Sequence, residues 1–367
     1  MICFAWDGFP QYAARCIRSF VQNTDEPVVV LATKPTVPIE GMEELCGCKV
    51  KWIGNNEPLD VCNTLGELPR VLFSGGWYVP TFNRLRDEVR NAGGRVIGMC
   101  DNNFVFSLKE CLKAIRFRLI LRGKYDGYFV PGKSGVRLLR FYGVPRDLIA
   151  TGMYSADASL FKNGMPLERR EKKIIYVGQF IKRKNVIRLV EAFTSAVRET
   201  NGGWSLDLYG SGVLKNELIR QSEAMNNKLS SVNCNVGVHD FVQPEQLAAL
   251  YQRARIFCLP SLWEHWGLVV HEAALSGCML VLGNRTGAGE DLLVRSDNGI
   301  GYANGFDFDP ANTTDIRHAL LRAMQMDENA LRRANEVSLK IAQSVSLDRF
   351  VRGVNALVSD SKNIGKE

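Results

Sequence analysis

The 367-residue sequence lacks a long hydrophobic run, and none of its apolar stretches approaches the ~18–20 residues that a membrane-spanning helix needs. Its N-terminal stretch, Met1–Gly8, has neither the basic region nor the cleavage site of a signal peptide, and we expect a first buried strand there. These absences predict a cytoplasmic protein. A peripheral position on the inner face of the membrane stays open as an addition to that prediction.

No CxxC pair occurs among the ten cysteines, and Cys46 and Cys48 are too close together for ordinary zinc spacing. Several cysteines, such as Cys258, lie inside apolar runs, where a thiol behaves as a small core residue. We therefore expect reduced thiols, with neither a disulfide framework nor a structural metal.

Histidine is scarce and confined to the second half of the chain, at His239, His265, His271 and His318. No imidazole of the first half is therefore available as a general base. A strong excess of one charge is also missing, because the net charge of +7 is small and dispersed. That charge is too weak for a nucleic-acid-binding footprint, and we expect no nucleic-acid partner.

One local cluster of charge interrupts an apolar run in the first half. Its basic residues alternate with Ile115, Phe117 and the stretch 119–121, and they are Lys113, Arg116, Arg118, Arg122 and Lys124. A basic amphipathic helix of this kind can rest on anionic lipid. It can equally be a solvated helix face over an ordinary core, and the sequence leaves both interpretations open.

Short apolar strands alternate with helical stretches along the whole chain, which predicts parallel sheets covered by helices. We expect strands at Met1–Trp6, Pro27–Ala32, Cys48–Ile53, Val71–Ser74, Arg95–Met99, Gly127–Val130, Lys173–Val177, Trp204–Tyr209, Ile256–Leu259 and Met279–Leu282. We expect helices at Tyr12–Asn23, Thr81–Ala92, Ser107–Leu121, Lys133–Tyr142, Val186–Thr200, Gln243–Arg253, Gly267–Leu275 and Thr314–Met326.

The chain is long enough for two doubly wound domains. The segment Lys162–Lys173, with six charged residues from Glu168 onward, has the composition of an exposed linker. We therefore expect one Rossmann-like domain over residues 1–165 and a second over residues 172–345. A C-terminal helix within residues 346–367 is expected to pack back toward the first domain.

The most informative string is Pro260–Gly277. A buried strand ends at Pro260, a loop carries Glu264, and a helix that bears Glu272 opens at Gly267. The first amides of such a helix, together with its dipole, favour a diphosphate, and a glycine lets the phosphate approach the backbone. Either glutamate alone would be interpreted as an ordinary solvated acid, so the functional interpretation depends on the whole string.

This string resembles the family 4 (group 1) glycosyltransferases, which are retaining enzymes of the GT-B fold, with two Rossmann-like domains facing across a cleft. Their hallmark is a pair of glutamates separated by seven residues, and Pro260-Ser261, Glu264, Trp266-Gly267 and Glu272-Ala273 supply its elements. The resemblance is specific across residues 172–330 and weak before them. It implies that the domain over residues 172–345 binds the nucleotide-sugar donor and that the domain over residues 1–165 binds the acceptor. It implies that Glu264 contacts the donor sugar and Glu272 the ribose. It also places the donor phosphates on the backbone around Trp266, Gly267, Leu268 and Val269.

The segment Ile174–Asn185 resembles the family's basic loop. In that loop an arginine directly after a glycine, and a lysine six residues after the same glycine, hold the pyrophosphate. Lys184 matches that lysine, whereas Gln179 follows Gly178 in place of the arginine, with Arg183 as a substitute. A fixed cation is needed to offset the charge that grows on the leaving diphosphate. The resemblance therefore makes Lys184 and Glu264 catalytic.

Weaker matches add candidates for the donor and the acceptor. By resemblance, Gly8 faces the donor phosphate, Gly210 lies in a glycine turn after a strand, and Phe241 and Val242 pack against the nucleobase. Asp101 lies in a loop where many family members place a histidine before the Asp, a position taken here by Cys100. Asp101 is either a catalytic contact to the incoming hydroxyl or the cap of a strand-end turn.

The resemblance implies a retaining mechanism in which the acceptor attacks from the side that the nucleotide leaves, and the departing phosphate takes the proton. We expect a UDP- or GDP-sugar as co-substrate, a glycan or lipid-linked acceptor, no cofactor and no metal. The expected setting is bacterial cell-surface polysaccharide biosynthesis, such as that of lipopolysaccharide. The alternatives are a sugar-nucleotide epimerase or phosphorylase of the same fold, or a non-catalytic nucleotide-sugar-binding partner.

Overall fold

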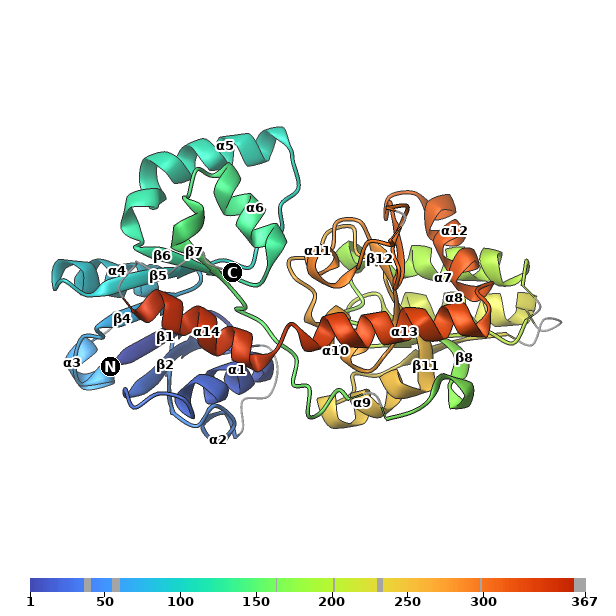
Figure 1. The fold of residues 1–367 in the computed structure, drawn as a ribbon, viewed down its shortest axis with the longest axis horizontal. Helices are drawn as coiled ribbons and strands as arrows, with labels where there is room; N and C mark the ends of the chain where they lie inside the picture. The colour runs from blue at the N-terminus through green and yellow to red at the C-terminus, as the bar shows by residue number, and fades with distance from the viewer. Residues whose placement is uncertain are drawn as a thin grey trace. The chain divides into compact units, whose positions relative to one another are not determined.

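The computed structural model describes residues 1–35, 41–54, 60–162, 164–200, 202–229, 234–297 and 299–359. The chain forms two compact units, one made of Met1–Ser155 with the C-terminal segment from Ser346, the other of Ala156–Val345. Each unit is a parallel sheet between layers of helices (Figure 1). The predicted pair of Rossmann-like domains is thereby confirmed.

The sheet of the first unit has the strand order β3-β2-β1-β4-β5-β6-β7, with every neighbouring pair parallel. Its strands are β1 (Ile2–Trp6), β2 (Val28–Thr33), β3 (Lys49–Ile53), β4 (Val71–Ser74), β5 (Arg95–Met99), β6 (Gly127–Val130) and β7 (Ile149–Thr151). The chain leaves β1 toward β2 and leaves β4 toward β5, in opposite directions along the sheet. A crevice therefore opens beyond the carboxyl ends of β1 and β4, where such sheets bind ligands.

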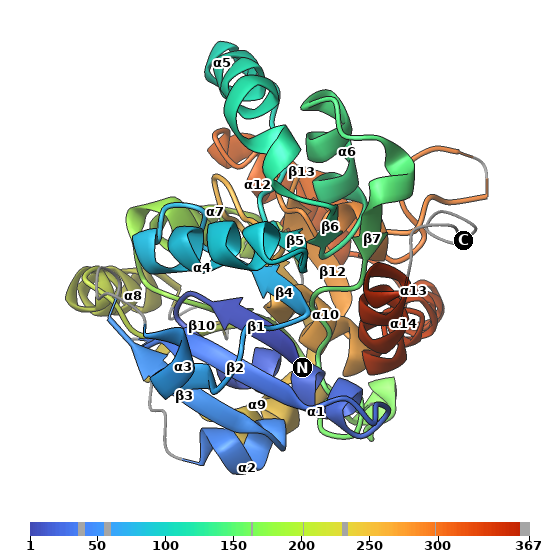
Figure 2. The same ribbon diagram turned by 90° about the vertical axis from the view of Figure 1, so that its left-hand side faces the viewer.

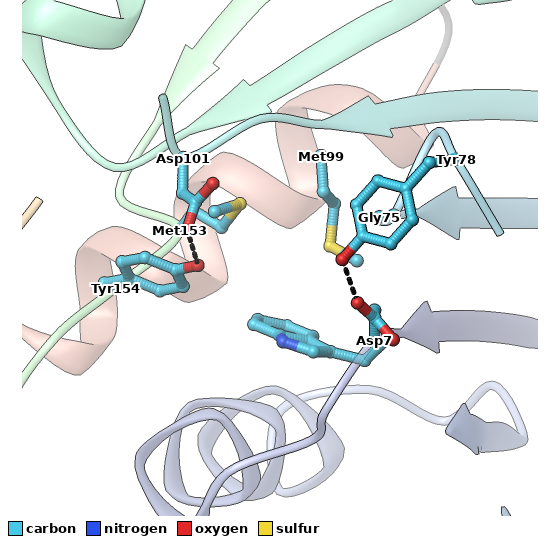
Figure 3. Close-up of a pocket in the computed structure, with 9 residues that line it drawn as sticks. Asp7, Gly75, Tyr78, Met99, Asp101, Met153 and Tyr154 are labelled. Atoms are coloured by element: carbon cyan, nitrogen blue, oxygen red, sulfur yellow. Dashed lines mark hydrogen bonds between the residues drawn. The ribbon is translucent and has the colours of Figure 1, made fainter. Parts of the chain in front are cut away.

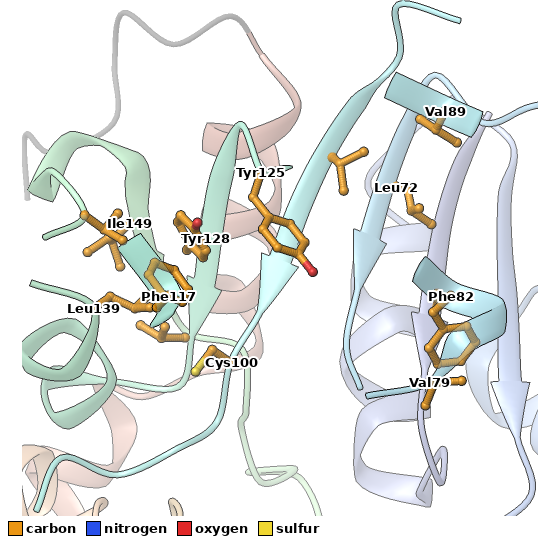
Figure 4. Packing of buried hydrophobic residues seen from close by; sticks show 14 of the residues in the cluster. Leu72, Val79, Phe82, Val89, Cys100, Phe117, Tyr125, Tyr128, Leu139 and Ile149 are labelled. Carbon is orange, nitrogen blue, oxygen red and sulfur yellow. The ribbon is translucent and has the colours of Figure 1, made fainter. Parts of the chain in front are cut away.

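Helices cover both faces of this sheet, so its strands are apolar on both sides. The helices of the unit are α1 (Gln11–Val21), α2 (Met42–Cys46), α3 (Val61–Leu65), α4 (Pro80–Asn91), α5 (Leu108–Arg116), α6 (Lys133–Phe141) and α14 (Leu347–Val358). One face packs Leu72 and Tyr128 against Phe82 of α4 and Leu139 of α6 (Figure 4). On the other face Phe350 of α14 lies against Phe4 and Phe129. Figures 1 and 2 show α14 beside α1.

The C-terminal helix is built into the sheet of the first unit. A Cβ atom at Gly353 of α14 would come within 2.7 Å of the Thr151 carbonyl oxygen at the end of β7, so only glycine permits this close packing. Residues 360–367 of the predicted C-terminal segment lie outside the described residues.

The sheet of the second unit has the order β10-β9-β8-β11-β12-β13, again with parallel neighbours. Its strands are β8 (Glu171–Val177), β9 (Ser205–Tyr209), β10 (Asn235–His239), β11 (Ala254–Leu259), β12 (Met279–Gly283) and β13 (Gly305–Phe308). Its helices are α7 (Val186–Val197), α8 (Lys215–Leu229), α9 (Pro244–Arg253), α10 (Leu268–Leu275), α11 (Gly289–Leu292), α12 (Thr313–Met324) and α13 (Glu328–Gln343). Here the reversal of chain direction falls between β8 and β11, and the loops after these strands lie where sheets of this kind bind ligands.

The ten predicted strands and eight predicted helices are present, with ends that differ by a few residues. The predicted helix Ser107–Leu121 is not α-helical to its end. After α5, Phe117–Leu121 forms a π-helical turn, and Arg122–Lys124 follows as a 3₁₀ turn. In the described part of the chain, no helix combines the length and the hydrophobicity needed to span a bilayer.

The expectation of an exposed linker over Lys162–Lys173 is wrong at its C-terminal end. The strand β8 already begins at Glu171, and Arg170 is buried. The Arg170 guanidinium donates to the carbonyl oxygens of Ala254 (3.2 Å), Ser276 (2.8 Å) and Gly277 (3.0 Å). One residue of this charged run, Arg170, can therefore be buried, because backbone carbonyl oxygens accept the hydrogen bonds of its guanidinium.

Candidate functional site

The loop between β11 and α10 is shaped by Gly267. This residue has φ 86°, in the left-handed region that favours glycine, and it caps α10. A Cβ atom here would lie 3.0 Å from Glu264 Cγ and 3.5 Å from Leu259 Cδ2. Glycine therefore lets the loop fold back so that Glu264 lies beside the start of the helix. The amides of Leu268 and Val269 belong to the first turn, whose N–H groups have no intrahelical acceptor.

The loop after β12 holds Glu264 from the other side. The Glu264 amide donates to the Arg285 carbonyl oxygen (3.1 Å), and the Gly287 amide donates to the Glu264 carbonyl oxygen (3.3 Å). The Trp266 indole N–H and the Thr286 hydroxyl in these loops are buried, and neither has a hydrogen-bond partner within the described ranges. Buried donors of this kind are groups that a bound ligand can satisfy.

The basic loop after β8 is joined to the same loop. Lys182–Lys184 forms a 3₁₀ turn, and the Leu262 amide donates to the Arg183 carbonyl oxygen (2.9 Å). Asn185 takes a left-handed conformation with φ 59°, and its side chain donates to the carbonyl oxygens of Pro260 (3.2 Å) and Pro310 (2.8 Å). These bonds fix the basic turn against the loop that carries Glu264.

Lys184 and Glu264 meet in a buried ion pair. Lys184 Nζ donates to Glu264 Oε2, which also accepts from the Ser261 hydroxyl (3.0 Å), while Arg183 Nη1 lies 3.5 Å from Glu264 Oε1. The exposed fractions are only 8% for Lys184 and 6% for Glu264. The two residues that the sequence analysis assigned to catalysis therefore share one site, at the switch point of the second sheet.

Burial and the neighbouring charges shift the pKa values of Glu264 and Lys184 in opposite directions. Burial would raise the pKa of Glu264, but the Lys184 ammonium, the Arg183 guanidinium and the Ser261 hydroxyl outweigh it and hold that pKa below the usual range. Burial lowers the pKa of Lys184 despite the opposing carboxylate. The pair is thus a fixed carboxylate beside a cation in a poorly solvated place, where charges interact strongly.

Glu272 lies on α10, five residues beyond Gly267. The Tyr251 hydroxyl donates to Glu272 Oε2 (3.2 Å). Burial raises the pKa of Glu272 to about 7, although the hydrogen bond from Tyr251 acts in the opposite direction. Near neutral pH this carboxyl group is therefore divided between its charged and neutral forms.

The remaining predicted donor contacts lie along the same edge of the second sheet. Gly178 and Gly210 directly follow β8 and β9, and a Cβ atom at Gly210 would come within 1.9 Å of the Gly178 carbonyl oxygen. The Gln179 side chain is exposed, and the Gln179 backbone carbonyl oxygen accepts from the Tyr176 hydroxyl (2.9 Å). Phe241 and Val242 follow β10, with Phe241 56% exposed, and neither takes part in the contacts around Glu264 given above.

His271 and the string Asp307–Asp309 of the second unit have structural roles. His271 is buried, and its Nδ1 accepts from the Ala156 amide (3.0 Å) while Nε2 lies 2.9 Å from the Ala342 carbonyl oxygen. These partners fix a neutral imidazole in a packing role. The Asp-x-Asp string Asp307–Asp309 is engaged locally, since Tyr302 donates to Asp307 (3.2 Å) and the Ala311 amide donates to Asp309 (3.0 Å). Among the described residues, no group of three His, Cys, Asp or Glu side chains could hold a metal ion.

The first unit contains a pocket of about 140 Å³ at its own switch point (Figure 3). Its walls come from the last residues of β1 and β5 and from the segments that follow β1, β4, β5 and β7. The lining residues are Trp6, Asp7, Gly75, Gly76, Tyr78, Met99, Asp101, Met153 and Tyr154. Asp101 accepts from the Tyr154 hydroxyl (3.2 Å), and Asp7 accepts from the hydroxyls of Tyr78 and Thr33. The predicted Asp101 is thus joined in the pocket by a second carboxylate that the sequence analysis missed.

The groups around these carboxylates stay protonated near neutral pH. The hydrogen bond to Asp7 raises the pKa of Tyr78 to about 12, and burial raises the pKa of Cys100 to about 12. The Gly8 amide donates to Thr33 Oγ1 (2.7 Å), so Gly8 supports the Asp7 loop, and it is not among the residues that line the pocket. An acidic pocket with tyrosine hydroxyls and the Trp6 ring suits a neutral polyhydroxyl compound.

Comparison with known proteins agrees with this geometry. Residues 159–338 match the family model of the glycosyl transferases group 1. The chain is 31% identical over 157 residues to a glycogen synthase of Mycobacterium tuberculosis, a match that covers 40% of this chain and about a third (36%) of that relative.

Solved structures resemble the fold over nearly the whole chain. HepE of Anabaena, solved in complex with UDP and glucose, aligns with a TM-score of 0.73 at 12% identity, covering 97% of this chain and 98% of its own. A glycosyltransferase from Rickettsia africae aligns with a TM-score of 0.71 at 10% identity, covering 99% of both chains. Sucrose-phosphate synthase from Thermosynechococcus elongatus aligns with a TM-score of 0.67 at 15% identity, covering 97% and 98%. At these identities the likeness shows the shared GT-B fold.

Proposed function

We propose that the protein moves a sugar from a UDP- or GDP-sugar, bound by the second unit, to an acceptor bound by the first, because residues 159–338 match the family model of the glycosyl transferases group 1. The observation that carries this proposal is the buried pair of Lys184 and Glu264 beside the glycine-opened start of α10. Complexes of HepE with UDP and with UDP-glucose support a uridine nucleotide.

The donor chemistry follows from charge. Cleavage of the bond between the sugar C1 and the diphosphate leaves negative charge on the phosphate oxygens. Lys184 has three N–H donors, of which Glu264 takes one, so the ammonium can also serve the phosphates. Arg183 and the first amides of α10 add positive charge and donors at the same place. This arrangement can stabilise the leaving group without a metal ion.

Glu264 acts on the sugar side. A carboxylate offers about four acceptor positions, so Glu264 can bind a donor hydroxyl while it stays paired with Lys184 and Ser261. The acceptor oxygen bonds to C1 on the face that the diphosphate leaves, and the departing phosphate oxygen takes its proton. The product then keeps the anomeric configuration of the donor, which defines a retaining transferase.

The acceptor is a glycan or a lipid-linked sugar of cell-surface polysaccharide biosynthesis. Asp7 and Asp101 place two carboxylates in the pocket of the first unit, and Trp6 supplies an aromatic surface. Carboxylates accept hydrogen bonds from sugar hydroxyls, and an aromatic ring packs against the apolar face of a pyranose. Asp101 orients the incoming hydroxyl in this proposal.

Titration of the full chain with UDP, GDP and ADP by calorimetry tests the donor site. We expect one nucleotide class to bind, and the corresponding nucleotide sugars to release nucleoside diphosphate when incubated with glycan acceptors. A chain that binds none of the three nucleotides would overturn the proposal. Conversion of the sugar without release of diphosphate would instead identify an epimerase.

Asp101→Asn tests the acceptor pocket. We expect sugar transfer to fall ~10–100-fold, because a hydrogen bond to a charged group contributes ~1.5–3 kcal/mol. Nucleotide affinity should stay unchanged, since Asp101 belongs to the first unit. The control is Asn102→Ala at the exposed neighbouring position, which should leave transfer intact. A loss of nucleotide affinity in Asp101→Asn would contradict an acceptor role.

A further inference from the structure

The outward face of α5 and its π-helical extension is apolar. Leu108, Leu112, Ile115 and Leu119 are 84%, 68%, 54% and 81% exposed. At ~100° per residue these four side chains fall within an arc of about 60°, so they form one continuous row, which we call the outward stripe. Ile120, 51% exposed, lies in the π-helical turn at the end of this row.

The opposite side of the same helix already holds it on the first unit. Glu110 is buried and accepts from the Tyr142 hydroxyl, while Ala114 and Phe117 belong to the core cluster (Figure 4). At ~100° per residue these inward residues lie about 130–170° around the helix from the centre of the outward stripe. The outward leucines therefore contribute nothing to the core of the unit, and their exposure needs another explanation.

Basic residues flank the outward stripe on both sides. Lys109, Lys113 and Arg116 lie along one flank, and Arg118 and Arg122 lie along the other. Arg118 is held in place by hydrogen bonds to the carbonyl oxygens of Phe141 (2.8 Å) and Tyr142 (3.1 Å). The single acid of residues 108–124 is Glu110, which faces the core. Lys113 pairs with Glu110 (3.1 Å), so the positive charge beside the apolar row comes from Lys109, Arg116, Arg118 and Arg122.

We propose that the outward stripe docks the protein on an anionic lipid bilayer. The leucine and isoleucine side chains enter the boundary between headgroups and acyl chains, and the flanking lysines and arginines bind lipid phosphates. A second copy of the chain fits this surface poorly, because packing two outward stripes together would bring their basic flanks into repulsion. The proposal goes beyond glycosyl transfer and depends on the first unit alone.

Sedimentation of the full chain with lipid vesicles tests this surface. We expect binding to vesicles of phosphatidylcholine with phosphatidylglycerol, weaker binding to phosphatidylcholine alone, and a decline as salt concentration rises. The double variant Leu112→Ser/Leu119→Ser should bind ~10–100-fold more weakly, because two leucine side chains no longer enter the apolar phase. The double variant Lys109→Gln/Arg116→Gln should lose the preference for anionic vesicles.

Ile300→Ser is the matched control, since Ile300 is 80% exposed but belongs to the second unit, and it should bind vesicles as the wild type does. All variants should keep the melting temperature and the nucleotide affinity of the wild type, because the substituted side chains are exposed and lie outside the donor site. Failure of the wild type to bind anionic vesicles would overturn the proposal. So would equal binding by the leucine variant, or self-association of the wild type that this variant abolishes.

Discussion

Replacing Lys184 with glutamine is expected to lower kcat/KM for sugar transfer by ~10²–10³-fold, which is the effect of removing one preorganised donor from a developing anion. The loss arises because the leaving diphosphate no longer meets the buried ammonium, while the glutamine amide can still donate to Glu264. Release of nucleoside diphosphate from the donor that calorimetry identifies measures the effect, and it also records slow hydrolysis in the absence of an acceptor.

Lys182→Gln provides the control for this variant, because Lys182 is an exposed cation in the same 3₁₀ turn. It should keep kcat/KM within about two-fold of the wild type, as surface charges contribute little when solvated. Breaking a buried ion pair costs ~3–5 kcal/mol when one charge is left uncompensated, so melting temperatures must accompany the kinetics. A folded Lys184→Gln protein with undiminished activity would remove Lys184 from the mechanism.

Much of the donor site could be predicted because it lies in one continuous string. Strands buried on both faces are mostly apolar, so the run Ile256–Leu259 of β11 and its end before Pro260 can be recognised in the sequence. Gly267 and Gly277 bracket α10, and both have the left-handed backbone that glycine favours. The contact between Lys184 and Glu264 joins residues 80 positions apart, and it follows once β8 and β11 are neighbours in the sheet.

The pocket of the first unit was harder to predict because four separate strand ends build it. Asp101 was proposed, whereas Asp7, Tyr78 and Tyr154 were not. A signal for Asp7 exists, since an acid directly follows the first buried strand and precedes a glycine with φ 60°. The pairing of Tyr78 with Asp7 depends on β1 and β4 being neighbours, which the strand order alone reveals.

Short edge strands and the orientation of helices escape sequence patterns for a physical reason. β7 has three residues, and β10 and β13 have partly exposed or polar positions, so their hydrophobic signal is weak. The sequence of α5 has a clear apolar periodicity, but this periodicity does not indicate which side of the helix is buried. Inward packing of Ala114 and Phe117 decides that question and leaves the leucines outside.

Glu272→Gln is expected to strengthen the fold at high pH. The pKa of Glu272 is about 7 in the folded protein, against the usual 4.5, so the folded state binds this proton more tightly than the unfolded chain does. The free energy of unfolding therefore falls as the pH rises from 4.5 to about 7, and the lost stability stays lost above that range. Glutamine cannot ionise, and its amide oxygen can still accept from Tyr251.

Urea unfolding at two pH values measures this effect. The variant should gain about 1–3 kcal/mol near pH 8 and almost nothing near pH 4.5, since each pKa unit corresponds to ~1.4 kcal/mol. Glu191→Gln, at an exposed position of α7, should show no such pH-dependent gain. An equal gain at both pH values would mean that the ionisation of Glu272 is not its cause.

The same substitution should weaken nucleotide binding ~10–100-fold, because the ribose hydroxyls lose a charged acceptor worth ~1.5–3 kcal/mol. If only the carboxylate form binds, wild-type affinity for a nucleotide sugar should rise about ten-fold from pH 6 to pH 8, and the variant should show no such rise. A nucleotide sugar is the correct probe, since it lacks the terminal phosphate that titrates near pH 6. The variant could instead be more stable at pH 8 and bind the nucleotide sugar as tightly as the wild type. That result would show that Glu272 is a buried carboxyl group that does not bind the ribose.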